Sequence, residues 1–124
     1  MMPNEFHALT VIGPGAWGTA LGSVVASKAV TVDTLGLESH ESDWARSLPP
    51  GRLVLIATPF SAIHGILPRL KRFKISGVIN ASKGIDRDSL LTFTQLARKS
   101  LKCPVATLSG PTFALEVQQQ KPTA

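Results

Sequence analysis

The sequence of 124 residues predicts a doubly wound α/β domain, in which helices cover both faces of one parallel sheet. Short apolar runs, suited to strands buried on both faces, alternate along the chain with segments of helical periodicity. Such an alternation is typical of parallel strands joined by helices. We expect strands at 8–13, 30–37, 53–59, 77–82 and 104–109, and helices at 17–28, 42–48, 61–70, 88–101 and from about 112.

The first half of the chain carries three of these strands. The run ALTVIG is apolar almost throughout, and the helix after it places Leu21, Val24 and Val25 on one face. The second strand lies within VTVDTLGL, and the short helix that follows must end before a Pro-Pro-Gly that no helix can cross. The third strand is the apolar run LVLIATP.

The second half repeats the alternation. Ser61 can cap the helix after the third strand, and Asp88 is expected to begin the helix after the fourth strand, GVINAS. The fifth strand is PVATLS, and the sequence after it suggests a helix that leads toward a sixth strand beyond the chain. The apolar positions of the two helices are Ile63, Ile66, Leu67 and Leu70 in the first and Leu90, Phe93, Ala97 and Leu101 in the second.

Composition narrows the class of protein. Hydrophobic residues make up 44% of the chain and charged residues 17%, which is typical of one globular domain. No apolar run is long enough to span a bilayer, and a single cysteine, Cys103, suits a reducing compartment, so we expect a cytoplasmic protein. The net charge of +5 comes without the interleaved aromatic residues of a nucleic-acid platform, and the three histidines have no metal-site spacing. We therefore expect neither nucleic acid nor metal as a partner.

A glycine-rich turn follows the first strand. Gly13, Gly15 and Gly18 form a GxGxxG between a strand and a helix, the context that distinguishes a dinucleotide-binding turn from a chance match. Gly13 permits the tight turn, Gly15 lets a pyrophosphate approach the backbone, and Gly18 allows close packing of helix on strand. The N-terminus of the helix supplies N–H donors to the phosphates. The sequence therefore predicts a Rossmann-like fold.

The adenosine end of such a ligand is read by an acidic residue about 20 positions further on. Glu38 follows the second strand at that distance, whereas the competing Asp33 falls within the strand. A carboxylate there favours NAD, because it repels the additional phosphate of NADP. An ordinary surface glutamate fits the sequence equally well, so both NAD and NADP remain open as the cofactor.

Three motifs together resemble the NAD(P)-dependent glycerol-3-phosphate dehydrogenases of bacterial type: GPGAWGTAL, ASKGID and LSGPTFALEV followed by KPTA. The resemblance implies that Ala16 and Trp17 lie against the cofactor and that Lys83 reaches both the substrate and the nicotinamide. Two further residues, Gly110 and Thr112, would then bind glycerol 3-phosphate. By the same resemblance Ala114 would contact the cofactor.

The implied reaction transfers a hydride between nicotinamide and C2 of sn-glycerol 3-phosphate, giving dihydroxyacetone phosphate for glycerophospholipid synthesis. In the family a lysine of a later helical domain handles the proton, so the catalytic residue is unknown here. We expect residues 1–124 to form the dinucleotide-binding domain, without that helical substrate domain. A homo-oligomer stays open, and a non-catalytic dinucleotide-binding or sensing module is the alternative function.

The chain departs from the family between its second and third strands. Only residues 39–52 join them, where the family has several times as many, including an additional strand. Without that strand, the third strand should lie directly beside the first, in the order 2-1-3-4-5. Phe60 should then overhang the nicotinamide end of the crevice.

Overall fold

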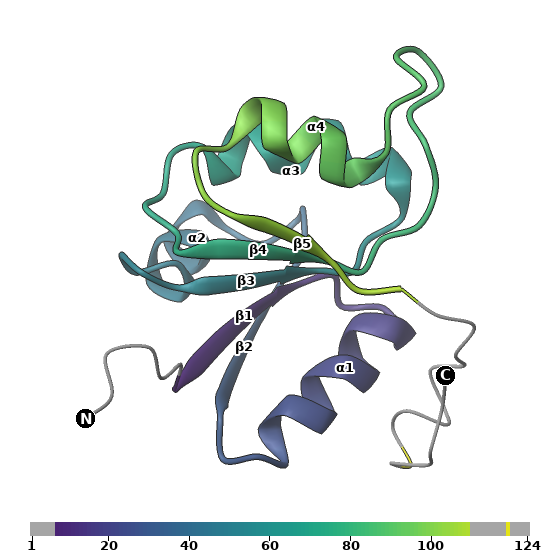
Figure 1. The fold of residues 1–124 in the computed structure, drawn as a ribbon. Coiled ribbons are helices and arrows are strands. Elements are labelled where there is room, and N and C mark those ends of the chain that lie inside the picture. The colour runs from purple at the N-terminus through teal and green to yellow at the C-terminus, as the bar shows by residue number, and fades with distance from the viewer. Residues whose placement is uncertain (1–6, 110–118, 120–124) are drawn as a thin grey trace.

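The computed structural model describes residues 7–109 and 119, and within them five parallel strands form one sheet (Figure 1). The strand order is β2-β1-β3-β4-β5, as expected for a chain in which β3 lies directly beside β1. The elements are β1 Ala8–Ile12, α1 Ala16–Ala26, β2 Thr31–Leu35, α2 Glu41–Ser47, β3 Leu53–Ile56, the 3-10 turn Phe60–Ala62, α3 Ile63–Leu70, β4 Gly77–Asn80, α4 Phe93–Ser100 and β5 Val105–Thr107.

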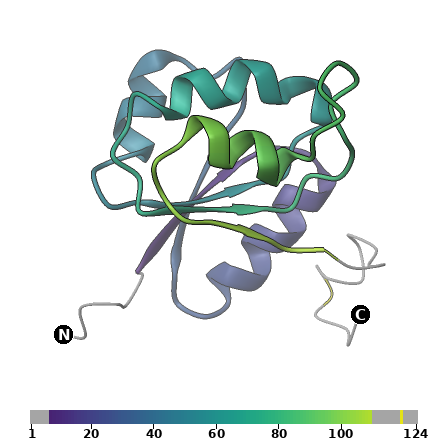
Figure 2. The ribbon, with the colours of Figure 1, turned by 45° about the horizontal axis from the view of Figure 1, so that its top comes forward.

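One face of the sheet is covered by α3 and α4, which lie side by side across it (Figure 2), together with α2. The main core forms beneath them, because alternate strand residues such as Ile12, Val54 and Ile56 point to this face and meet apolar helix residues. Ile63, Ile66, Leu67 and Leu70 are all buried there, as their helical spacing predicts.

The opposite face carries α1, packed over Leu9, Val11 and Leu55. Leu21 and Val25 of α1 contact this smaller cluster, as their spacing predicts. Beside α1 an apolar groove of about 390 Å³ runs along the sheet as far as Leu108. Among the described helices, α1 is the one that packs on this face.

Two expected helix starts were wrong. The helix predicted from Asp88 begins at Phe93, because Thr92 and Gln95 form a capping box in which each side chain accepts from the other residue's backbone N–H. Leu90, expected on the apolar face, is instead exposed and has a φ of 60°. Ser61 does not cap α3, because a 3-10 turn already begins at Phe60, with the Ala62 N–H bonded to the Pro59 carbonyl.

The corrected start of α4 predicts a large loss of stability at one apolar residue and almost none at another three positions away. Phe93 is 1% exposed, so Phe93→Ala should lower the free energy of unfolding by about 3–5 kcal/mol. Leu90 is 69% exposed, so Leu90→Ala should change it by less than about 0.5 kcal/mol. Urea unfolding of both variants checks this, and equal losses would contradict the observed start of the helix.

Candidate functional site

The glycine turn is the point at which three strands meet. The Gly13 N–H donates to the Leu35 carbonyl at the end of β2, and the Ala57 N–H after β3 donates to the Ile12 carbonyl. Gly13 has a φ of 130°, and a Cβ placed there would lie 2.3 Å from the Ala57 carbonyl oxygen. Since no L side chain fits this position, the tight turn expected at Gly13 is confirmed.

The third glycine of the motif brings α1 against that turn. A Cβ on Gly18 would lie 2.1 Å from the Gly13 carbonyl oxygen and 3.3 Å from Cγ1 of Val11. Because there is no room for a side chain, the backbone of α1 approaches β1 closely and its first turn lies directly over the glycine turn. The packing role expected for Gly18 is therefore confirmed.

The fold itself does not require a glycine at position 15, the middle glycine of the motif. Gly15 is the N-cap of α1 with an ordinary φ of −76°, and a Cβ there would meet no described atom within 4 Å. Among the described residues, no side chain caps α1 and no acidic residue lies in its first turn. The first N–H groups of the helix therefore face open space beside Ala16, which is exposed, and are suited to an anion.

Two buried polar atoms near this turn have no hydrogen-bond partner among the described residues: Nε1 of Trp17, in the first turn of α1, and the hydroxyl of Thr58. Thr58 lies beside the turn, since its Cγ2 would be 3.3 Å from a Cβ on Gly13. Buried polar atoms without a partner are uncommon in native structures and are often explained by a ligand or water.

The two acidic candidates at the second strand differ in their surroundings. Asp33 lies within β2, and its carboxylate is held 2.9 Å from the Arg52 guanidinium. Glu38 follows the end of β2 and is exposed, with its carboxylate folded back over Gly36. Glu38 is thus three residues beyond Leu35, whose carbonyl is bonded to Gly13.

The ends of β3 and β4 are joined by polar contacts that the sequence analysis missed. The Ser82 hydroxyl accepts from the Thr58 N–H, and the buried Asn80 carboxamide accepts from the Ser82 N–H and donates to the Ser82 carbonyl. These contacts fix the backbone immediately before Lys83, whose side chain is exposed. The polar Asn80 at the end of a buried strand, with a serine two positions later, was the signal that could have indicated them.

The aromatic residue expected near this edge is half-buried. Phe60 lies against Gly84, since a Cβ there would be 3.4 Å from its Cδ2 atom, and it also contacts the main core. The structure thus brings Phe60 close to the residue that follows Lys83. Whether either side chain contacts a cofactor stays a prediction, as it does for Ala16, Trp17 and Glu38.

A hairpin-like loop extends from Gly84 to Thr92 and is held by Asp86. Its carboxylate lies 2.9 Å from Nε2 of His64 and accepts from both the hydroxyl and the N–H of Ser89. The pKa of Asp86 is lowered from its usual 3.8 to about 2. The hydrogen bond from the Ser89 hydroxyl is the largest cause, and the His64 contact is the next. The loop and the start of α3 border an open pocket of about 640 Å³.

Three predicted site residues, Gly110, Thr112 and Ala114, lie outside the described residues, as does the helix expected from about Thr112. Within the described ranges, no three histidine, cysteine, aspartate or glutamate side chains are grouped as a metal site. In the same ranges, no helix is long and apolar enough to cross a bilayer.

The fold and the turn together define the class of this protein. A parallel α/β sheet with helices on both faces, and a glycine turn between β1 and the open N-terminus of α1, is a Rossmann-like domain.

Comparison with known proteins gives the family. Residues 37–124 match the model described as the NAD-dependent glycerol-3-phosphate dehydrogenase N-terminus. The chain therefore belongs to the glycerol-3-phosphate dehydrogenase family, as its three motifs suggested.

Curated relatives agree. Glycerol-3-phosphate dehydrogenase (NAD(P)+) of Anaeromyxobacter sp. is 32% identical over 147 residues, which cover 93% of this chain and 44% of the relative. The enzyme of Geobacter metallireducens is 34% identical over 146 residues, which cover 92% of this chain and 44% of the relative. The chain thus spans about half the length of the curated relatives it matches. The matched region is longer than the 124 residues of the whole chain, so these relatives carry additional residues within it.

Solved structures show the same fold. Glycerol-3-phosphate dehydrogenase of Coxiella burnetii superposes with a TM-score of 0.76 at 26% identity, covering 95% of this chain and 45% of that one. The Saccharomyces cerevisiae structure, at 19% identity and a TM-score of 0.70, covers 94% of this chain and 45% of its own, and supports the fold alone.

The Asp86 cluster predicts a pH dependence. Because the pKa of Asp86 is about 2 in the folded protein and near 3.8 when unfolded, its contribution is fully present above about pH 4. It is lost as the pH falls toward 2, since the unfolded state then binds the additional proton. Asp86→Asn should thus be less stable than the wild type at pH 6, and the difference should shrink between pH 4 and 2.

Urea unfolding at several pH values measures that difference. Asp88→Asn, a change two residues away, is the matched control and should leave the pH dependence of stability close to that of the wild type. A gap between Asp86→Asn and the wild type that stays constant from pH 6 to 2 would contradict the assignment.

Proposed function

We propose that this chain is the cofactor-binding part of an NAD(P)-dependent glycerol-3-phosphate dehydrogenase. The observation that supports it most is the open N-terminus of α1, where Gly15 carries no side chain although its own backbone and neighbours would accept one. A pyrophosphate at that place would occupy the space and accept from the first N–H groups of the helix. The unpartnered polar atoms of Trp17 and Thr58 beside it also suit a polar ligand.

In this proposal Gly13 and Gly18 shape the turn, Gly15 and Ala16 lie against the pyrophosphate, and Trp17 packs beside the cofactor. Glu38 hydrogen-bonds the adenosine ribose, which favours NAD over NADP because the carboxylate repels the 2′-phosphate. The remaining proposed contacts are Phe60, Lys83 and Ala114 to the cofactor, and Lys83, Gly110 and Thr112 to the substrate.

The proposed reaction oxidises sn-glycerol 3-phosphate at C2 to dihydroxyacetone phosphate, or runs in reverse. NAD(P), when bound, supplies the acceptor for the hydride, and the hydroxyl proton leaves to a base. We assign that base to no residue of this chain. Lys83 is held at the end of β4 by the Asn80 and Ser82 contacts, where its charge can stabilise a developing oxyanion and orient the phosphate.

The family supports a role in supplying the glycerol phosphate backbone of phospholipids, and we place the protein in the cytoplasm. The positive net charge of +5 suits a substrate and a cofactor that are both anionic.

Calorimetric titration with NADH tests this function. Gly15→Val should fold like the wild type but bind NADH at least about tenfold more weakly, because its methyl groups would occupy the pyrophosphate space. Ala26→Val, at the other end of α1, is the matched control and should bind within about twofold of the wild type. Equal binding by Gly15→Val, or no saturable binding of NADH and NADPH by the wild type, would contradict the proposal.

A further inference from the structure

We propose that Arg69 is a positioning residue that holds the loop of residues 36–39, and with it Glu38, and so sets the preference for NADH over NADPH. The inference rests on the proposed function, because it concerns the adenosine end of the same site. Arg69 lies on α3 and has no proposed contact with cofactor or substrate.

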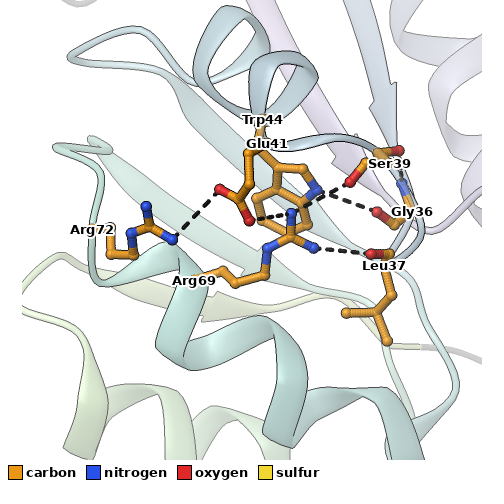
Figure 3. A network of polar contacts seen from close by, with 7 residues as sticks. All are labelled: Gly36, Leu37, Ser39, Glu41, Trp44, Arg69 and Arg72. Atoms are coloured by element: carbon orange, nitrogen blue, oxygen red, sulfur yellow. Dashed lines mark hydrogen bonds and ion pairs between the residues drawn. The ribbon is translucent and has the colours of Figure 1, made fainter.

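The guanidinium of Arg69 binds the loop on both sides of Glu38 (Figure 3). Its Nη1 donates to the Leu37 carbonyl at 2.9 Å, and its Nη2 donates to the Ser39 carbonyl at 3.4 Å. These are the residues immediately before and after Glu38. With both flanking carbonyls held by one rigid group, the backbone of Glu38 has little freedom to turn.

Arg69 is itself held in place. Its guanidinium carbon lies 3.9 Å from the ring centroid of Trp44, and its Nη2 is 2.9 Å from the Glu41 carboxylate. The Arg69 side chain is only 18% exposed, whereas Glu41 is 61% exposed, so solvent screens the ion pair and the stacking on Trp44 is the better shielded contact. Trp44 is fully buried, and therefore gives the arginine a fixed surface.

Two further hydrogen bonds hold the same loop, one from α2 and one within the loop. The Trp44 Nε1–H donates to the Gly36 carbonyl at 3.3 Å, and the Gly36 N–H donates to the Ser39 hydroxyl at 2.9 Å. Leu37 packs over Gly65, one helical turn before Arg69 on the same face of α3. The loop is thus a small turn clamped between α2 and α3.

The clamped loop begins next to the glycine turn. Leu35, whose carbonyl accepts from the Gly13 N–H, directly precedes Gly36, over which the Glu38 carboxylate is folded. A carboxylate fixed there can accept from both ribose hydroxyls and repel a 2′-phosphate. If the loop were loosened, the Glu38 carboxylate would lose the ribose contact and would move away from the 2′-phosphate.

Arg72, two residues beyond the end of α3, is a matched control. Arg72 also contacts Glu41, at 3.4 Å, but its side chain is 65% exposed and this contact does not involve residues 36–39. Loss of Arg72 removes the same charge from the same helix end without releasing the loop.

Calorimetric titration of the full chain with NADH and NADPH tests the inference. Arg69→Gln should weaken the binding of NADH about five- to tenfold and change that of NADPH less than about twofold, so the preference for NADH is lost. Arg72→Gln should leave both within about twofold. Ser39→Ala, which loosens the same turn from within, should shift the ratio in the same direction and keeps the test available if Arg69→Gln does not fold.

The ratio of NADH affinity to NADPH affinity distinguishes a positioning role from general destabilisation. General destabilisation would weaken the binding of both cofactors alike. In a Glu38→Gln background, Arg69→Gln should have no further effect on the ratio. An unchanged ratio in Arg69→Gln and Ser39→Ala, or equal weakening of both cofactors, would overturn the inference while NADH binding by the wild type upholds the proposed function. If the wild type binds neither cofactor, the proposed function fails and this inference fails with it.

Discussion

Three strand ends approach one another closely at Gly13, and this packing determines where α1 begins. A backbone that can take a φ of 130° lets β1 turn within van der Waals reach of Ala57 while bonding to Leu35 of β2. The same turn allows α1 to begin directly above it, because Gly18 carries no side chain. The open helix N-terminus, and hence the proposed cofactor site, is a consequence of that packing.

The loop after β2 shows how a surface residue can be fixed by residues distant in sequence. Asp33 lies within β2 and forms an ion pair with Arg52, so its carboxylate already has a structural partner. Glu38 lies on a turn held by Arg69 of α3, thirty-one positions further along the chain, and by Trp44. An arginine that stacks on a buried indole while bonding two carbonyls combines charge with a rigid geometry that lysine lacks.

Much of the fold could be predicted because its signals are local. Apolar strands, helical spacing and the glycine turn predicted the parallel sheet and the turn geometry of Gly13 and Gly18, and the short connection 39–52, compared with the family, predicted the strand order. The start of α4 was missed although Thr92 and Gln95 carry the capping-box pattern, because the apolar Leu90 suited an earlier start. The Arg69–Trp44 stack and the Asn80–Ser82 contacts join separate elements or depend on loop geometry, so periodicity gave no indication of them.

If the glycine turn and the loop after β2 form one cofactor site, both should respond to NADH in amide chemical-shift mapping of the isotopically labelled chain. The largest shifts should occur at Gly13, Gly15 and Gly18 and at residues 36–38, and they should saturate together at one dissociation constant. Shifts confined to other surfaces, such as the apolar groove beside α1, or an absence of saturable shifts at the turn, would contradict it.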